Sequence, residues 1–293
     1  MTLSPAGRVA RSTPRPHSGT AGPARRRTLL RTSDGVPIDA VYESGAAAHE
    51  SDGIARTGPT GPSARPAFVV AHGFTGDADR PHVRRVAGVL ASYGAVVTFS
   101  FRGHGASGGR STVGDREVRD LAAAVAWARE LGHRRVATVG FSMGGSVVLR
   151  QAALYDRDSG LRPDAVVSVS APARWYYRGT APMRRLHWLV TRPGGRLVSR
   201  YGLRTRVHHR GWDPVPLSPV GAAARIAPTP LLVVHGEQDA YFPVDHPRML
   251  AAAAGDHGEL WLEPAMGHAE HAATDALLRR IGDWAAARAG RSG

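Results

Sequence analysis

The sequence predicts an α/β fold with a mostly parallel central sheet and helices on both faces. Short apolar runs rich in β-branched residues recur along the chain, with helix-like stretches between them. The runs are continuously apolar, as expected for strands buried on both faces. They are Ala67–Ala71, Ala95–Phe101, Val136–Phe141, Ala165–Val169 and Leu231–Val234. Such alternation implies right-handed crossovers, which place functional groups at the carboxyl ends of the strands.

The clearest helix pattern lies in Asp115–Leu131. Its apolar residues repeat at helical spacing, and most of its charged residues fall elsewhere on the helical wheel. The pattern predicts a helix that lays one apolar face on the sheet.

A different pattern precedes the first buried run. The segments Thr28–Thr32 and Val36–Glu43 flank the turn residues Ser33-Asp34-Gly35. Two short strand-like segments joined by such a turn predict an antiparallel hairpin ahead of the parallel sheet.

Length and composition fit one large globular domain, or a domain with an insertion. The chain has 293 residues, of which 42% are hydrophobic, and this excludes fibrous and wholly disordered proteins. It has no cysteine, which excludes disulfides, a cysteine nucleophile and thiolate metal sites. No stretch approaches 18 apolar residues, so we expect no membrane span. With no export signal recognised, we expect a cytoplasmic location.

Two segments are too polar and too rich in Pro, Gly and Ser to contribute to a core. Residues 1–27 are expected to form a disordered basic tail, and residues 44–65 a flexible loop within the domain.

The net charge of +14 is unevenly distributed, and every basic residue is arginine. Seven arginines lie in residues 1–33 and ten in residues 173–212, and neither segment contains an acid. The rest of the chain is slightly acidic. A net positive charge of this size is typical of proteins that bind nucleic acid, an anionic membrane or an acidic partner. Because the core is near neutral, charge alone does not indicate nucleic-acid binding.

A candidate nucleophile stands at the end of the third buried run. The sequence Gly140-Phe141-Ser142-Met143-Gly144 fits the pattern G-x-S-x-G, with a strand before it and the helix-compatible stretch Ser146–Tyr155 after it. In that context a sharp turn lifts the serine hydroxyl clear of the sheet. The flanking glycines avoid collisions with neighbouring backbone.

A serine hydroxyl needs a base to take its proton and a carboxylate to orient that base. Asp239 follows the run Leu231–Val234, and His268 follows the apolar run Leu260–Leu262, so both lie where a parallel sheet delivers functional groups. The other candidates are Asp245 and Glu237 for the acid, and His271 and His257 for the base.

The tetrahedral intermediate of acyl transfer also needs two backbone donors for its oxyanion. One is expected to be the amide of Met143, which directly follows the serine. The other is expected to be the amide of Phe74, in the loop His72-Gly73-Phe74-Thr75-Gly76 after the first buried run.

The motifs HGFTG, FRGHGAS, GFSMGG, HGEQD and GH, in this order, resemble those of the α/β-hydrolase superfamily. Within it the chain resembles the capped esterase, monoacylglycerol-lipase and serine-aminopeptidase group, over roughly residues 28–172 and 213–290. The resemblance implies an α/β-hydrolase fold, a catalytic triad of Ser142, Asp239 and His268, an oxyanion hole at Phe74 and Met143, and no cofactor. In one departure, Ser100 stands where the group often has an aspartate two residues before the arginine of R-G-H-G. Support for Arg102 from that position is therefore in doubt.

Two other motifs in the sequence suggest different functions. Gly103–Gly108 matches the dinucleotide pattern G-x-G-x-x-G, but Gly109, Ser111 and Gly114 delay any helix that could meet a pyrophosphate. Among the histidines, His268-Ala269-Glu270-His271 is explained by one catalytic histidine and its neighbours rather than by a metal site.

Residues 173–212 lie between two predicted strands, where capped hydrolases insert a lid, so we expect an inserted helical cap between core segments 28–172 and 213–293. Aromatic residues interleaved with arginine could bind nucleic acid. We favour a cap whose aromatic side chains face the catalytic pocket and whose arginines are solvated. The aromatic residues are Trp175, Tyr176, Tyr177, Trp188, Tyr201 and Trp212.

The sequence thus predicts a serine hydrolase that cleaves small-molecule carboxylic esters through an acyl-enzyme. One alternative is a thioesterase acting on a carrier-bound acyl group. Another is a binding module for acidic partners in which the triad is idle. An acidic partner could also bind the arginine-rich tail or cap, whereas nucleic acid is not expected.

Overall fold

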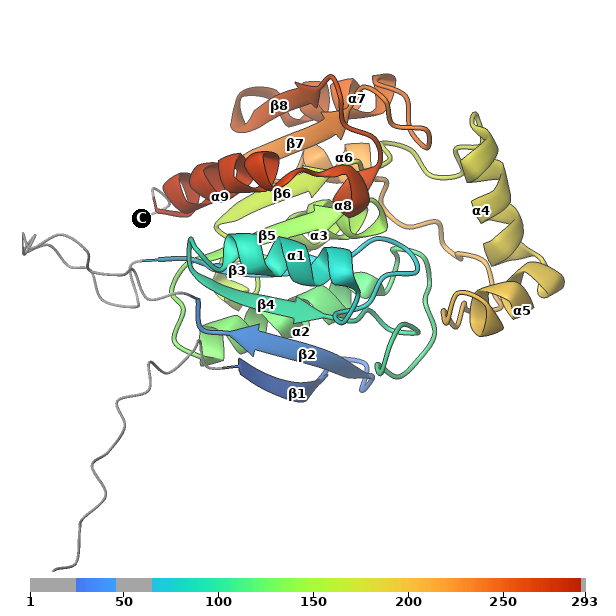
Figure 1. The fold of residues 1–293 in the computed structure, drawn as a ribbon, viewed down its shortest axis with the longest axis horizontal. Helices are drawn as coiled ribbons and strands as arrows, with labels where there is room; N and C mark the ends of the chain where they lie inside the picture. The colour runs from blue at the N-terminus through green and yellow to red at the C-terminus, as the bar shows by residue number, and fades with distance from the viewer. Residues whose placement is uncertain (1–24, 46–64, 291–293) are drawn as a thin grey trace, which may run out of the picture.

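A computed structural model describes residues 25–45 and 65–290 (Figure 1). Its central sheet has the strand order β1-β2-β4-β3-β5-β6-β7-β8. The pairs β1·β2 and β2·β4 are antiparallel, and all other neighbours are parallel. The strands are β1 Arg25–Arg31, β2 Pro37–Glu43, β3 Ala67–Ala71, β4 Ala95–Phe99, β5 Val136–Phe141, β6 Ala165–Val169, β7 Leu231–Gly236 and β8 Gly258–Glu263. The predicted α/β fold with a mostly parallel sheet is confirmed.

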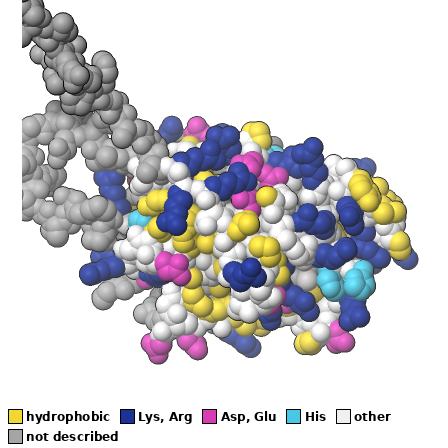
Figure 2. Space-filling view, turned by 90° about the horizontal axis from the view of Figure 1, so that it is seen from below, with side chains coloured by type: hydrophobic (Ala, Val, Ile, Leu, Met, Phe, Trp, Pro, Cys, Tyr) yellow, Lys and Arg dark blue, Asp and Glu magenta, His cyan; other side chains and the backbone are white. Residues whose placement is uncertain are grey.

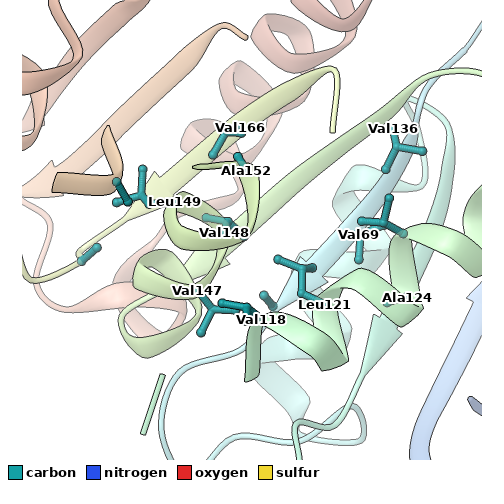
Figure 3. Close-up of a cluster of buried hydrophobic side chains, with 14 of the residues drawn as sticks. Val69, Val118, Leu121, Ala124, Val136, Val147, Val148, Leu149, Ala152 and Val166 are labelled. Carbon is teal, nitrogen blue, oxygen red and sulfur yellow. The ribbon is translucent and has the colours of Figure 1, made fainter. Parts of the chain in front are cut away.

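Helices cover both faces of this sheet. One face packs against α1 (Pro81–Leu90) and α9 (Asp275–Ala289). The other packs against α2 (Glu117–Glu130), α3 (Met143–Leu154), α6 (Pro219–Ala223) and α7 (Asp245–Ala254). Figure 3 shows side chains of α2 and α3 meeting those of the strands, with Val118 and Leu121 on the face predicted to be apolar. The short helix α8 spans Ala269–Ala272.

The first hairpin differs from the prediction at its start. Strand β1 begins at Arg25, so the end of the basic tail, which was expected at residue 27, lies inside the sheet. The side chain of Arg27 explains the difference, because it donates to Asp39 at 2.6 and 2.7 Å and to Asp79 at 2.8 and 3.1 Å. The tail up to residue 24 and residues 46–64 of the predicted loop lie outside the described residues.

Between β6 and β7 the chain leaves the sheet and forms α4 (Ala181–Thr191) and α5 (Pro193–Tyr201). These two helices lie beyond the carboxyl ends of the parallel strands (Figure 1). The chain then returns to the core, where Val207 forms an isolated parallel bridge with Ser111. The indole of Trp212 donates to the carbonyl of Thr112 at 2.6 Å. The insertion is therefore anchored to the loop that follows β4.

Within the described ranges, no helix is both long and apolar enough to cross a membrane.

The interface between α2 and the sheet gives a test of the core. Leu121 is fully buried there, whereas Leu154 at the end of α3 is 48% exposed. Leu121→Ala removes buried methyl groups and leaves a cavity, so we expect it to lower the free energy of unfolding by about 2–5 kcal/mol. Leu154→Ala is the control and is expected to cost less than about 1 kcal/mol. Urea unfolding followed by circular dichroism measures both, and equal losses would contradict the described interface.

Candidate active site

Ser142 occupies a sharp turn between β5 and α3. Its backbone has φ 52° and ψ −112°, a left-handed conformation that is rare for a residue with a side chain. A Cβ atom at Gly140 would collide with the carbonyl of Gly144, and one at Gly144 would collide with the carbonyl of Ala71. The turn therefore needs glycine on both sides of the serine, as the motif predicted.

His268 lies between Ser142 and Asp239. Its Nε2 is 2.9 Å from the Ser142 hydroxyl, and its Nδ1 is 2.8 Å from Oδ2 of Asp239. The ring of Tyr241 stacks on the imidazole with centroids 4.2 Å apart. The three predicted residues thus form one hydrogen-bonded chain, in which the imidazole can take the serine proton and the carboxylate can orient the imidazole.

The Asp239 carboxylate is held from several sides. Its Oδ1 accepts hydrogen bonds from the amides of Tyr241 and Phe242 at 2.8 and 3.1 Å. Burial works to raise the pKa of this carboxyl, but the hydrogen bond from His268, the amide of Tyr241 and the charge of His235 together lower it. Asp239 is therefore set to remain ionised beside the imidazole.

The alternative acids and bases lie elsewhere. Asp245 pairs with Arg174 at 3.0 Å, and Glu237 is exposed. His271 places its ring 3.8 Å from that of His82, while Nε2 of His257 is 3.3 Å from the carbonyl of Ala223. The structure brings none of these four into hydrogen-bond contact with Ser142 or His268.

Two amides beside Ser142 have no acceptor. Within the described residues, neither the Phe74 amide nor the Met143 amide donates a hydrogen bond, and both residues line the same cavity as Ser142. The neighbouring loop amides are engaged, since Gly73 donates to Glu270 at 3.0 Å and Thr75 to His104 at 3.4 Å. The two amides predicted as oxyanion donors are therefore free to bind an acceptor in the cavity.

Arg102 finds its partners far from Ser100 in sequence. The guanidinium binds Asp120 of α2 at 2.7 and 2.9 Å and Asp34 of the hairpin turn at 2.8 and 3.0 Å. Hydrogen bonds from Arg102 lower the pKa of Asp34, whereas burial raises the pKa of Asp120 against the opposing effect of Arg102. Ser100 instead accepts a hydrogen bond from the amide of Ala78 at 3.1 Å. The partners of Arg102 could not be predicted from the sequence, because the R-G-H-G motif does not indicate which carboxylates lie beside the guanidinium.

A cavity of about 320 Å³ opens beside Ser142, near the lower end of the usual range for ligand pockets. Four of the six aromatic residues of the insertion line it: Trp175, Tyr176, Tyr177 and Trp212. Trp188 and Tyr201 do not, and they are 49% and 74% exposed. The expectation that all six face the pocket is therefore wrong for these two. The expectation that the arginines are only solvated is also incomplete, since three of them line the cavity: Arg174, Arg196 and Arg210.

One group in the described part of the chain has the donor spacing of a metal site. Ligand atoms of His82, Glu270 and His271 lie within 4.8 Å of one another. Glu270 already accepts the Gly73 amide, so in the structure its carboxylate fixes the loop that precedes Phe74.

The comparisons with known proteins agree with the described fold. A model of the alpha/beta hydrolase family matches residues 68–280, which is most of the chain. The chain therefore belongs to the alpha/beta hydrolase family. No curated protein matches the sequence.

Several solved structures share the fold at low sequence identity. An esterase of Pyrococcus furiosus, Pf2001, is 21% identical, with a TM-score of 0.65 over 89% of this chain and 92% of that one. The alpha/beta hydrolase GrgF of a Penicillium species is 18% identical, with a TM-score of 0.65 over 90% and 99%. A putative aryl esterase of Burkholderia cenocepacia is 18% identical, with a TM-score of 0.60 over 91% and 100%. At these identities the likeness shows a shared fold.

The glycines of the turn allow a matched test of its packing. Gly144→Ala places a methyl group against the carbonyl of Ala71, so we expect it to destabilise the protein by about 1–3 kcal/mol. Gly88→Ala, in the exposed part of α1, meets nothing within 4 Å and is expected to stabilise by about 0.5–1 kcal/mol. Opposite signs in thermal unfolding are the expected result, and a stabilising Gly144→Ala would contradict the described turn.

Proposed function

We propose that this protein is a serine hydrolase that cleaves carboxylic esters through an acyl-enzyme intermediate. The observation that carries the proposal is the hydrogen-bonded chain Ser142, His268, Asp239 beside the two free amides of Phe74 and Met143. Each part supplies one requirement of acyl transfer: a nucleophile, a base, a group that orients the base, and donors for the oxyanion.

In this mechanism His268 takes the proton of Ser142 as its hydroxyl oxygen attacks the ester carbonyl. Negative charge develops on the carbonyl oxygen, and the amides of Phe74 and Met143 stabilise it. When the tetrahedral intermediate collapses, His268 returns the proton to the departing alcohol. Water then attacks the acyl-enzyme with His268 again as base, which releases the acid and restores Ser142. Asp239 stabilises the imidazolium at each step.

We further propose that residues 173–212 act as a cap that shapes the substrate pocket. Helices α4 and α5 both contribute residues to the cavity beside Ser142, as do the segments on either side of them. Mostly apolar and aromatic side chains line it, which suits the acyl or aryl part of an ester. The similar Pyrococcus furiosus structure is named an esterase and the Burkholderia cenocepacia one a putative aryl esterase. A further similar structure, Est1E of Butyrivibrio proteoclasticus with a TM-score of 0.54, has ferulic acid bound.

The triad is tested by Ser142→Ala and Asp239→Asn. We expect Ser142→Ala to lower kcat for a p-nitrophenyl ester by at least about 10⁴-fold, because the nucleophile is lost. Asp239→Asn is expected to lower kcat by about 10²–10⁴-fold, because the imidazole loses its orienting charge. Unfolding curves of both variants check that the fold is kept. Unchanged turnover in Ser142→Ala would overturn the proposal.

Labelling with a fluorophosphonate probe is a second test of Ser142 as the nucleophile. Ser146 is the control, since it lies one turn further along α3 and its buried hydroxyl has no hydrogen-bond partner in the part of the chain that the structure describes. The probe is expected to label the unmodified protein and Ser146→Ala, but not Ser142→Ala. The absence of an adduct at Ser142 would instead favour the binding module for acidic partners.

The same residues could serve a carrier-bound thioester, and comparing matched oxyesters and thioesters distinguishes the two substrate classes. The cytoplasmic location stays a prediction from the sequence.

A further inference from the structure

Positive charge gathers at one part of the cavity beside Ser142. Arg196 of α5 and the segment His208-His209-Arg210 all line it. In Figure 2, arginine and histidine side chains lie together at the end of the molecule that carries α4 and α5. This part of a mostly apolar cavity thus contains two guanidinium groups and two imidazoles, while Arg174 and His187 line the cavity as well.

The anchoring of the insertion to the core brings these groups together. His208 donates its amide to the carbonyl of Ser111 at 2.8 Å, next to the bridge between Ser111 and Val207. The rings of His208 and His209 stack with centroids 4.8 Å apart. Desolvation, and then the charges of His208, Arg210, Arg110 and Arg196, lower the pKa of His209. Arg110 of the core thus adds to the positive electrostatic field at His209, although it does not line the cavity.

Carboxylates do not balance this cluster. Within residues 25–45 and 65–290, none lies within 4.0 Å of Arg110, Arg196 or Arg210, although Arg174 in the same cavity is paired with Asp245. The Arg196 guanidinium donates to the carbonyl of Thr191 at 2.7 Å, and that of Arg210 has no partner among the described residues.

The buried carboxylate on the core side is also engaged elsewhere. Glu117 accepts hydrogen bonds from the hydroxyls of Ser111 and Thr112 and from the amides of Thr112 and Gly114. No carboxylate of residues 25–45 or 65–290 therefore pairs with Arg110, Arg196 or Arg210, and these groups can bind an anionic ligand.

A guanidinium that lines a pocket and has no carboxylate partner can bind a carboxylate or phosphate oxygen through charge-assisted hydrogen bonds. We propose that Arg196 and Arg210 bind an anionic group of the substrate, so that the preferred substrates are esters that carry a carboxylate or phosphate away from the scissile bond. This inference rests on the proposed ester hydrolysis at Ser142 and specifies its substrate class.

The test compares three chromogenic esters. The neutral one is p-nitrophenyl hexanoate. Mono-p-nitrophenyl adipate replaces the terminal methyl of the acyl chain by a carboxylate, and 3-carboxy-4-nitrophenyl hexanoate carries the carboxylate on the leaving group. For each ester kcat/KM is measured in the unmodified protein, Arg196→Gln, Arg210→Gln and the double variant.

Arg200→Gln is the matched control, because it removes the same charge from α5 at an exposed residue outside the cavity. We expect the double variant to lose about tenfold in kcat/KM for at least one carboxylate ester, mainly through KM. The neutral ester is expected to change less than about twofold, and Arg200→Gln to leave all three unchanged. The ester that responds shows on which side of the scissile bond the anion lies.

Two outcomes would overturn the inference: an equal effect of the double variant on all three esters, or an equal effect of Arg200→Gln on the charged ones. The second would mean that the general field of the cap acts, rather than these two arginines.

A binding measurement separates this inference from the proposed function. Trp175 and Trp212 line the cavity, so tryptophan fluorescence can report its occupancy. In Ser142→Ala protein, monomethyl adipate is expected to bind more tightly than methyl hexanoate, and the double change Arg196→Gln, Arg210→Gln to abolish the difference. If the unmodified protein hydrolyses none of the esters, the proposed function fails, and this titration still decides whether the anion site exists. Equal affinities for the two methyl esters would overturn it.

Discussion

The backbone conformation of Ser142 is the constraint on which the rest of the site depends. A residue with a side chain at positive φ costs about 1–3 kcal/mol unless its surroundings hold it there. Here the Ser142 amide donates to the carbonyl of Val169 on the neighbouring strand at 2.8 Å, while Gly144 presses α3 against the end of β3. That approach leaves no room for a side chain at position 144. The Met143 amide, which directly follows the serine at the start of α3, has no acceptor among the described residues.

The parallel sheet explains how residues far apart in sequence reach this turn. Strands β3, β5, β6, β7 and β8 lie side by side in that order and point the same way, so their carboxyl ends share one edge. Phe74 follows β3, Ser142 follows β5, Asp239 follows β7 and His268 follows β8. Long-range polar contacts then fix the loops: Glu270 holds the amide of Gly73 at one side of the serine. The sheet thus brings the loops that carry the candidate site residues to one edge, and a few buried hydrogen bonds fix the positions of these loops.

The features that could be predicted from the sequence are those that a local pattern of residues indicates. Strand β5 and the helix after it were recognisable because a continuous apolar run, a G-x-S-x-G motif and a helix-compatible stretch are local patterns, and Ser142, Asp239 and His268 each follow an apolar run within a few residues. The partners of Arg102 were not recognisable. Asp34 and Asp120 lie 68 and 18 residues away, and only the folded hairpin and α2 bring them to the guanidinium.

Contacts between residues far apart in sequence also decide the structure of the insertion and of the first strand, and they could not be predicted. Composition shows that residues 173–212 are rich in aromatic residues and arginine, but not which of them face inward. Trp188 and Tyr201 are exposed, whereas Trp175 and Trp212 line the cavity. The hydrogen bond from Trp212 to the carbonyl of Thr112 joins residues 100 positions apart, and such a contact is not visible in the sequence. Likewise, a run of three arginines suggests a solvated tail, yet Arg25 and Arg27 pair with Glu43 and Asp39 of the neighbouring strand, and the run forms the start of β1.

Electrostatics gives the insertion a role beyond covering the serine. A guanidinium at the wall of an empty pocket keeps part of its hydration, so leaving it without a carboxylate costs less than it would in a sealed core. A neutral ligand that fills the pocket displaces this water and offers no charge in return. An anionic ligand replaces the water with charge-assisted hydrogen bonds in surroundings less polar than bulk solvent, where these bonds are stronger. A pocket with apolar walls and unpaired arginines therefore favours anionic over neutral ligands for two reasons. The neutral ligand removes hydration from the guanidinium without replacing it, and the anionic ligand forms charge-assisted hydrogen bonds.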